Sequence, residues 1–439
     1  MFKETSKELL DFLSKSPTAF HAVENYRQIL NADGFKELLE SEHWDIVPGG
    51  KYYVTRNNTS ILAFKVGTKL DNYSFNIVTS HTDSPTFKVK ENAEIEVKNK
   101  YTQLNTEGYG GMLCATWLDR PLSIAGRVLV SEGNSIVTKL LNIDRDLLMI
   151  PNVAIHMNRA ANDGFKYNLQ VDMLPLLSAG DDRQKDFKQI IADELGVKKE
   201  DILGHDLYLY NRMAPSIWGA NEEFISSGHL DDLQCGFASL KALLAGYNDE
   251  SIDIMACFDN EEVGSGTKQG ADSTLLRDTL VRINSALGKT EEDYHRALAS
   301  SFMLSSDNAH AVHPNHPEHT DATNCTYMNE GVVVKSHAGQ KYTSDGVSMA
   351  VVKALASGAD VPLQYFANRS DKAGGSTLGN IAMAQASMNA VDIGLPQLAM
   401  HSSYETAGIK DTYYAITLMK ALFDSHIQET STHSLEIKR

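Results

Sequence analysis

The fold is decided by residues 252–262, which read IDIMACFDNEE. An apolar run of strand length, Ile252–Phe258, is followed at once by a cluster of acidic residues. Other apolar runs also end in an imidazole or a carboxylate: FNIVTSHTD at 75–83, FMLSSD at 302–307 and QLAMH at 397–401. In open α/β sheets, functional sites form beyond the carboxyl ends of the strands. We therefore expect these strand ends to meet at one crevice.

Helical patterns separate the strands. After HLDD at 229–232, apolar residues at 233, 237, 240 and 244 give a helix with one apolar stripe. Further helices are expected at 267–286, 344–357, 376–389 and 408–424, and further strands at 60–84, 301–305, 331–335 and 397–400. This alternation predicts an α/β fold in which helices cover both faces of one sheet.

The texture of the chain changes after Pro85. Residues 87–98 alternate between apolar and charged side chains, and residues 117–130 and 135–143 continue in that style. Such alternation is typical of half-buried strands. We therefore predict a discontinuous catalytic domain, residues 1–85 plus 221–439, and a β-rich inserted domain, residues 86–220.

The composition excludes several classes of partner. The 439-residue chain has 57 Asp and Glu residues against 40 Lys and Arg residues, which gives a net charge of −17. Proteins that bind nucleic acids or anionic membranes present a basic face instead, so we expect neither partner. No apolar stretch has the ~18 residues that a membrane span requires. The cysteines stand far apart and form no disulfide framework, so the simplest location is the cytoplasm.

The residues at the strand ends suit a pair of metal ions. They include imidazoles and carboxylates but no thiolate, which favours Zn²⁺, with Mn²⁺ or Co²⁺ as alternatives. In binuclear hydrolases the cations lie ~3.5–4 Å apart and share a carboxylate. Because Glu261 and Glu262 are adjacent, their side chains point in different directions. One should bind a metal, and the other should take the proton of the attacking water. Asp83, two residues after His81, could hydrogen-bond an imidazole ligand.

Short strings at these positions resemble the M18 aspartyl aminopeptidase family. They are HTDSP at 81–85, SGHLDDL at 227–233, DNEEVGS at 259–265, SSDNAHAVHPN at 305–315 and LAMHSSYE at 398–405. The resemblance implies a zinc-peptidase-like α/β/α sandwich with an inserted β-rich dimerisation domain. It also implies a general base, Glu261, and a catalytic carboxylate, Asp83. The metal ligands that it implies are His81, Asp231 (bridging), Glu262, Asp307 and His401.

The resemblance extends to substrate recognition. KSHAGQKY at 335–342 is similar to a family segment that ends in QRY, which implies that Lys335 and Tyr342 hold an acidic N-terminal side chain. The family's arginine is Lys341 here, which weakens bidentate carboxylate binding if that residue takes part. His156, in IPNVAIHMNR at 150–159, matches a histidine that reaches the neighbouring subunit's site. The implied assembly is a homo-oligomer, a tetrahedral dodecamer whose inward-facing sites admit short peptides.

The resulting prediction is a metal-dependent aminopeptidase that removes N-terminal residues, preferably acidic ones, from short peptides. Another binuclear hydrolase on the same scaffold, a carboxypeptidase or an N-deacylase, stays open. So does a non-catalytic assembly protein whose metals only stabilise the fold. A glycosidase that uses Glu261 and Glu262 is disfavoured, because glycosidase carboxylates face each other across a cleft rather than stand adjacent in sequence.

Overall fold

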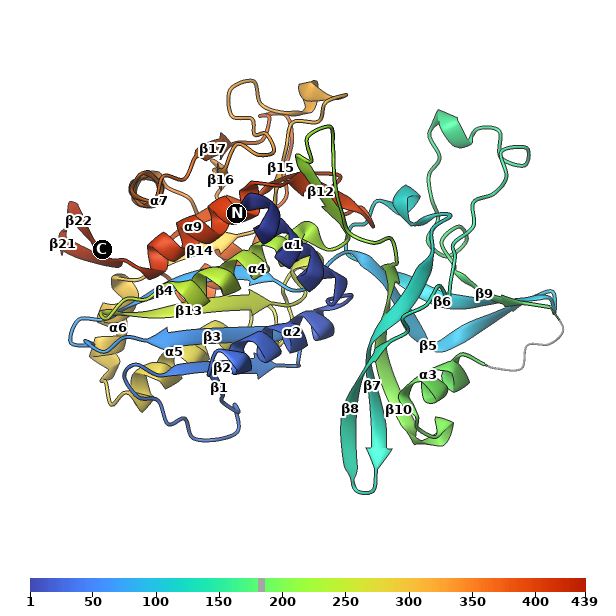
Figure 1. Cartoon of the computed structure of the whole chain (residues 1–439), viewed down its shortest axis with the longest axis horizontal. Helices are drawn as coiled ribbons and strands as arrows, with labels where there is room; N and C mark the ends of the chain where they lie inside the picture. The colour runs from blue at the N-terminus through green and yellow to red at the C-terminus, as the bar shows by residue number, and fades with distance from the viewer. Residues whose placement is uncertain (181–185) are drawn as a thin grey trace.

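A mixed central sheet crosses the molecule in the computed structural model, which describes residues 1–180 and 186–439 (Figure 1). In spatial order its strands are β1 (Lys36–Glu37), β2 (Lys51–Arg56), β3 (Ser60–Val66), β13 (Ser251–Phe258), β4 (Ser74–His81), β14 (Phe302–Ser306), β18 (Asn389–Gly394), β16 (Val332–Lys335) and β17 (Leu363–Phe366). The neighbours β13, β4, β14 and β18 are mutually parallel. Their carboxyl ends therefore lie side by side at one edge of the sheet.

Helices cover both faces of the central sheet because its strands are buried on both sides. Along β3, Ile61 and Ala63 join one apolar cluster, whereas Leu62 and Phe64 join the other, as the two-residue period of a strand requires. The first cluster includes α1 (Phe2–Ser14), α2 (Ala19–Ala32), α4 (Leu230–Ala245), α7 (Gly346–Gly358) and α9 (Asp411–Phe423). The second includes α5 (Leu275–Ala286), α6 (Glu291–Ala299) and α8 (Leu378–Gln385). The predicted α/β fold with two helical layers is confirmed.

The β-rich segment forms a separate antiparallel sheet, which we call the insert sheet (Figure 1). Its strands, in spatial order, are β8 (Ser135–Asn142), β7 (Leu122–Glu132), β10 (Ile202–Asn211), β5 (Thr86–Val97), β6 (Tyr101–Tyr109) and β9 (Leu176–Ala179). The sheet packs its own apolar core, which includes residues of α3 (Phe187–Leu195). The domain boundaries at 86 and 220 stay a prediction.

Several predicted elements differ in extent from those in the structure. The predicted helix 376–389 ends at Gln385 in the structure. Asn389, the last residue of the predicted range, is the first residue of β18, a central strand that the sequence analysis did not predict. The helix predicted from residue 267 begins at Leu275, and the strand predicted from residue 117 begins at Leu122.

The strand predicted at 397–400 was assigned to the wrong sheet. It is β19 (Pro396–Leu398), which belongs to a small sheet beside the central one. The order of that sheet is β11 (Ser216–Trp218), β12 (Phe224–Ser227), β20 (Glu405–Gly408), β19 and β15 (Ala309–His310). A hairpin of β21 (His426–Ser431) and β22 (Ser434–Lys438) ends the chain. None of the helices in the described residues has the length and apolar character to cross a bilayer.

Candidate metal centre and active site

Three neighbouring strand ends deliver the first predicted residues. His81 is the last residue of β4, and Asp307 follows β14 directly. Beyond β13 the chain turns through a short 3-10 helix, Glu261–Val263, which carries Glu261 and Glu262. Phe258 of β13 pairs in register with His81 of β4, so the acidic turn begins beside the imidazole. The structure thus brings these strand ends together, as the sequence predicted.

Asp231 lies between the two predicted histidine ligands. It is buried near the start of α4. Its Oδ1 lies 3.4 Å from His81 Nε2, and its Oδ2 lies 3.4 Å from His401 Nε2. His81 Nε2 is also 3.8 Å from Asp307 Oδ1, and His401 Nε2 is 3.4 Å from Glu262 Oε2. One carboxylate therefore faces both imidazoles, each of which has a second carboxylate beside it.

Backbone carbonyl groups orient both imidazoles. His81 Nδ1 donates to the carbonyl oxygen of Asp83 at 3.0 Å, and His401 Nδ1 donates to that of Gly111 at 3.1 Å. Because a carbonyl can only accept, each ring carries its proton on Nδ1 when neutral. Each Nε2 then carries a lone pair of electrons and faces the carboxylates, which is the arrangement that a metal-binding histidine needs.

The Asp83 carboxylate holds the acidic turn in place. Its Oδ1 accepts the backbone N–H of Glu261 at 3.1 Å, and its Oδ2 accepts that of Glu262 at 3.2 Å. The hydroxyl of Tyr109, at the end of β6, donates to the same Oδ2 at 2.7 Å. Asp83 thereby connects β4, the turn after β13 and the insert sheet.

The concentration of buried carboxylates shapes the electrostatics of the site. Burial, reinforced by the charges of Asp307 and Asp83, raises the pKa of Glu261 to about 8. Burial and the charge of Asp231 raise the pKa of Glu262 well above its usual range. Burial opposes protonation of His81, but its contacts with Asp231, Asp307 and Asp83 outweigh burial and raise its pKa. Positive charge nearby would stabilise the ionised forms of these acids.

The donor set fits divalent metal ions. Side-chain atoms of Asp231, Glu262 and His401 lie within 4.8 Å of one another, as do those of His81, Glu261 and Glu262. Within the described structure, Asp231 Oδ1 and Glu262 Oε1 are buried without a hydrogen-bond donor. An unsatisfied buried oxygen is costly unless a cation faces it. Mixed nitrogen and oxygen donors suit Zn²⁺, Mn²⁺ or Co²⁺.

The predicted substrate residues Lys335 and Tyr342 share a pocket of about 160 Å³ with Asp231, Glu261, Asp307 and His401. Lys335 is buried, and its Nζ donates to the carbonyl of Asn308 at 2.8 Å and lies over the Tyr342 ring. Burial alone would lower the pKa of Lys335, but the charge of Asp307 and the other acids nearby raise it. Lys335 is therefore a buried cation in the wall of the pocket.

His156 lies apart from this pocket. It is exposed in the segment between β8 and β9, which extends away from the central sheet (Figure 1). Among the described residues, no hydrogen bond or ion pair joins its side chain to another predicted site residue. Its predicted action on a neighbouring subunit stays a prediction.

Sequence reasoning missed residues that support the site from a distance. Buried Glu405 accepts the backbone N–H of Asp231 at 3.0 Å and that of His401 at 2.8 Å. Asp232 accepts the N–H of His81 at 3.1 Å. Glu405 and Asp232 occur within the strings LAMHSSYE and SGHLDDL, so the strings contained a signal for them. Tyr109 and Gly111 had no such signal.

Comparisons with known proteins show the family to which the chain belongs. Residues 12–423 match the model of a family described as aminopeptidase I zinc metalloprotease (M18). A probable M18 family aminopeptidase 2 of Clostridium novyi is 48% identical over 425 residues, which cover 95% of this chain and 98% of the relative. The solved mApe1 dodecamer of Saccharomyces cerevisiae matches with a TM-score of 0.84 and 28% identity, over 96% of this chain and 97% of that one.

An M18 aminopeptidase of Thermotoga maritima shares the fold, with a TM-score of 0.84 at 23% identity and 96% coverage of both chains. The family model and the clostridial relative both extend over most of the chain, and the matched residues 12–423 include the candidate metal ligands and the pocket around Lys335. This protein is therefore a member of the M18 family of zinc metalloaminopeptidases.

Proposed function

We propose that this metalloaminopeptidase removes acidic N-terminal residues from short peptides with two divalent metal ions and Glu261 as the general base. The observation that carries the proposal is the position of Asp231, whose two carboxylate oxygens each face one histidine at 3.4 Å. A carboxylate shared in this way is what a binuclear site requires.

The residues divide into two ligand groups that share Asp231. His81 and Asp307 would complete one group, and Glu262 and His401 the other, in accordance with the contacts between them. Zinc is the family's metal, and Mn²⁺ or Co²⁺ could bind the same donors. The bound ions would supply Lewis acidity toward the scissile carbonyl and activate water as a nucleophile.

Glu261 is the proposed proton carrier. Its side chain lines the pocket, and the N–H of its backbone is held by Asp83. It would take a proton from the attacking water and deliver it to the leaving amine of the peptide. Asp83 would act by orienting His81 and the turn that carries Glu261.

Lys335 is the proposed determinant of acidic selectivity. It is a buried ammonium group in the pocket that also holds Tyr342. A cation removed from water attracts a carboxylate strongly and disfavours a basic side chain. An apolar first residue offers Lys335 no carboxylate to pair with, so it should be a poorer substrate.

A panel of aminoacyl amides tests the proposal. Asp, Glu, Leu and Lys amides are assayed with enzyme that has been stripped of metal and refilled with one metal at a time. We expect no hydrolysis without metal, and faster hydrolysis of the Asp and Glu amides. The matched variant Lys335→Met should lose that preference and retain cleavage of the Leu amide. Faster cleavage of N-acyl amino acids than of any amide would contradict an aminopeptidase that binds a free amino group.

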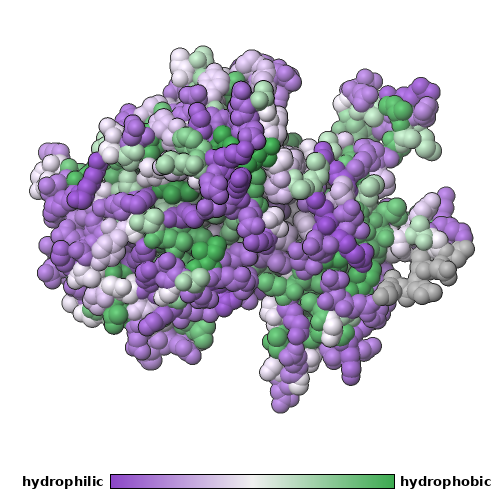
Figure 2. Space-filling model, in the orientation of Figure 1, coloured by the Kyte–Doolittle hydropathy of each residue, from purple (hydrophilic) through white to green (hydrophobic). Residues whose placement is uncertain are grey.

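We also propose that the chain assembles as a homo-oligomer, a tetrahedral dodecamer in which the insert sheet forms a dimer contact. Support comes from the similarity to the yeast mApe1 dodecamer and from exposed apolar residues on the insert, such as Ile136, Leu203 and Met157. Figure 2 shows hydrophobic surface on the insert side of the molecule. The acidic net charge of −17 agrees with a cytoplasmic enzyme without nucleic-acid or membrane partners.

The role of His156 in this assembly can be tested by subunit mixing. Subunits with His156→Ala have complete catalytic residues of their own, whereas subunits with Glu261→Gln retain His156. If His156 acts on the neighbouring subunit, assemblies reconstituted from both variants should regain activity that neither variant has alone. Light scattering of the wild type should give the mass of twelve chains, and a stable monomer would contradict the assembly.

A further inference from the structure

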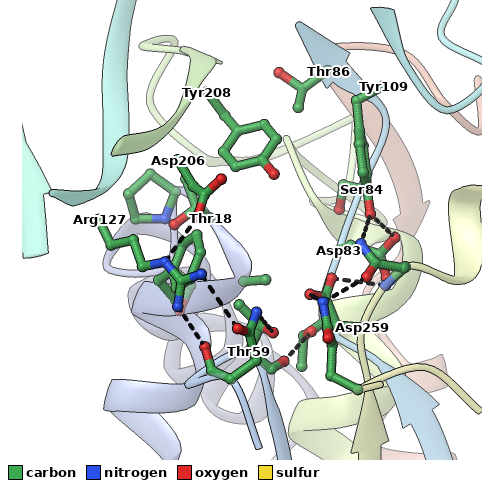
Figure 3. A pocket seen from close by; sticks show the side chains of 18 of the residues that line it. Thr18, Thr59, Asp83, Ser84, Thr86, Tyr109, Arg127, Asp206, Tyr208 and Asp259 are labelled. Atoms are coloured by element: carbon green, nitrogen blue, oxygen red, sulfur yellow. Dashed lines mark hydrogen bonds and ion pairs between the residues drawn. The ribbon is translucent and has the colours of Figure 1, made fainter. Parts of the chain in front are cut away.

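A second cavity, of about 320 Å³, is lined in part by Asp83, which follows the candidate metal ligand His81 by two residues (Figure 3). Its walls come from the start of α2, from strands β5, β7 and β10 of the insert sheet, and from the turn after β13. None of its lining residues lines the pocket around Lys335. Its volume lies at the lower end of the range for small-molecule sites. It is therefore a separate cavity that shares a wall with the catalytic centre.

One wall of this cavity is cationic. The Arg127 guanidinium donates through Nε to Asp206 Oδ2 at 2.9 Å and through both terminal nitrogens to Asn57. Lys88 Nζ donates to Asp206 Oδ1 at 2.9 Å. Arg127 and Lys88 thus share a single carboxylate, which leaves one net positive charge. Since a guanidinium has five N–H groups and an ammonium three, both side chains retain donors that can be directed at a ligand.

The opposite wall is acidic. Asp83 and Asp259 face Arg127 and Asp206 across the open space (Figure 3). Both aspartates are buried. Asp259 Oδ1 accepts the N–H of Asn260 at 2.7 Å, Thr59 donates a side-chain hydrogen bond to the same carboxylate, and Oδ2 has a long contact of 3.4 Å with the side-chain amide of Gln269. The carboxylates on this wall therefore have capacity to accept further hydrogen bonds.

Two polar side chains at the cavity are not satisfied by the protein. Tyr208 packs its ring 5.7 Å from that of Tyr109 and points its hydroxyl into the space between the two walls (Figure 3). Within residues 1–180 and 186–439, neither this hydroxyl nor the imidazole of His229 has a hydrogen-bond partner. Half-buried polar groups that converge on one cavity are typical of a site that orients a ligand.

We propose that this cavity binds a small zwitterion of the amino-acid type. Its carboxylate would accept hydrogen bonds from Arg127, Lys88 and the Tyr208 hydroxyl, and its ammonium group would donate to Asp259 and Asp83. Two walls of opposite charge favour a ligand that carries both charges over one that carries either alone. Because Asp83 belongs to both sites, occupancy would be felt at the turn that holds Glu261. The inference goes beyond the proposed function and stands on the cavity alone.

Calorimetric titration of the zinc-loaded enzyme tests this site. The probes are L-leucine and L-glutamate, with N-acetyl-L-leucine and isoamylamine as analogues that lack one of the two charges. The variants are Arg127→Gln and Tyr208→Phe in the cavity wall, and Lys335→Met in the other pocket as a control. Tyr208→Phe retains the ring and removes only the unpartnered hydroxyl, so its fold should match that of the wild type.

We expect a free amino acid to bind, and its dissociation constant to rise about tenfold or more in Arg127→Gln and several-fold in Tyr208→Phe. Lys335→Met should leave that constant unchanged. Binding that is lost in Lys335→Met and retained in the cavity variants would assign the amino acid to the active site and overturn the proposal. Equal binding of either single-charge analogue would also overturn the proposal. So would the absence of binding by every probe at about 10 mM. Hydrolysis of aminoacyl amides is measured separately, so a failed catalytic proposal is distinguishable from an empty cavity.

Discussion

The hydroxyl of Tyr109 donates a hydrogen bond of 2.7 Å to Oδ2 of Asp83, and this contact joins the insert sheet to the metal centre. The same hydroxyl accepts from the side-chain amide of Asn260 at 2.7 Å. Two residues further along, the carbonyl of Gly111 fixes the ring of His401. The segment after β6 therefore supports both halves of the site, and a change in the insert should be felt in catalysis.

Tyr109→Phe removes this hydrogen bond and leaves the ring in place. A hydrogen bond to a charged group is worth about 1.5–3 kcal/mol, so kcat should fall about tenfold or more while KM changes little. The measurement is steady-state kinetics with an aminoacyl substrate, accompanied by zinc titration. Tyr208→Phe, on the neighbouring ring, is the matched control and should retain wild-type kcat. Equal kcat values for the two variants would mean that Asp83 does not depend on Tyr109.

Glu261→Gln preserves the shape of the side chain and removes its ability to take a proton. We expect kcat to fall by about 10²–10⁴-fold, the usual contribution of a general base, with the metal content unchanged. The adjacent variant Glu262→Gln should instead lower the metal content, since Glu262 Oε2 faces His401 Nε2 at 3.4 Å. Elemental analysis and kinetics on both proteins separate the two roles. If Glu261→Gln lost metal and Glu262→Gln lost only kcat, our assignment of base and ligand would be reversed.

Glu405→Gln tests whether the hydrogen bonds that Glu405 accepts from the backbone of Asp231 and His401 contribute to metal binding. The Glu405 carboxylate accepts N–H groups from both Asp231 and His401, whereas a glutamine can offer only one accepting oxygen. One backbone N–H would then face an amide N–H₂ group. Loss of such indirect support weakens metal binding about 10–100-fold, which competition with a chelator can measure. Unchanged zinc affinity together with lower thermal stability would show that Glu405 serves only the fold.

Asp253 should make stability depend on pH. It lies on β13 far from the metal ligands, where Asn76 and Ser251 donate to its Oδ1 at 3.1 and 2.9 Å. Burial raises its pKa to about 8, from an ordinary value of 3.8. A raised pKa means that the folded protein binds the proton more tightly than the unfolded chain does. The contribution is fully present below about pH 4 and is lost as the pH rises through about 8.

Asp253→Asn retains the accepting oxygen and cannot ionise. The thermal midpoint of the wild type should therefore fall relative to that of the variant between pH 5 and pH 9, by an amount that corresponds to a few kcal/mol. Because the metal centre is the same in both proteins, its own pH dependence cancels in the difference. A difference between the two midpoints that stays constant over this range would show that Asp253 is already ionised in the folded protein.

The sequence was most informative where one residue directly follows a buried strand. His81, Asp307 and the pair Glu261 and Glu262 could be placed at one edge because β4, β13 and β14 each contain an apolar run of strand length, and parallel strands end together. His401 was predicted at the same edge for the wrong reason. It follows β19 of the small sheet, and only the packing of that sheet against the central one brings it to Asp231.

The amino-acid sequence by itself determined the alternating α/β pattern and the β-rich segment, because these follow from local periodicity, and it placed most of the candidate metal ligands at strand ends. Only the tertiary structure decided which groups orient them. Gly111 and His401 are 290 positions apart, and Tyr109 and Asn260 are 151 apart. Contacts over such separations, and the cavity behind Asp83, depend on how the insert packs against the central sheet, and no local pattern of residues encodes that packing.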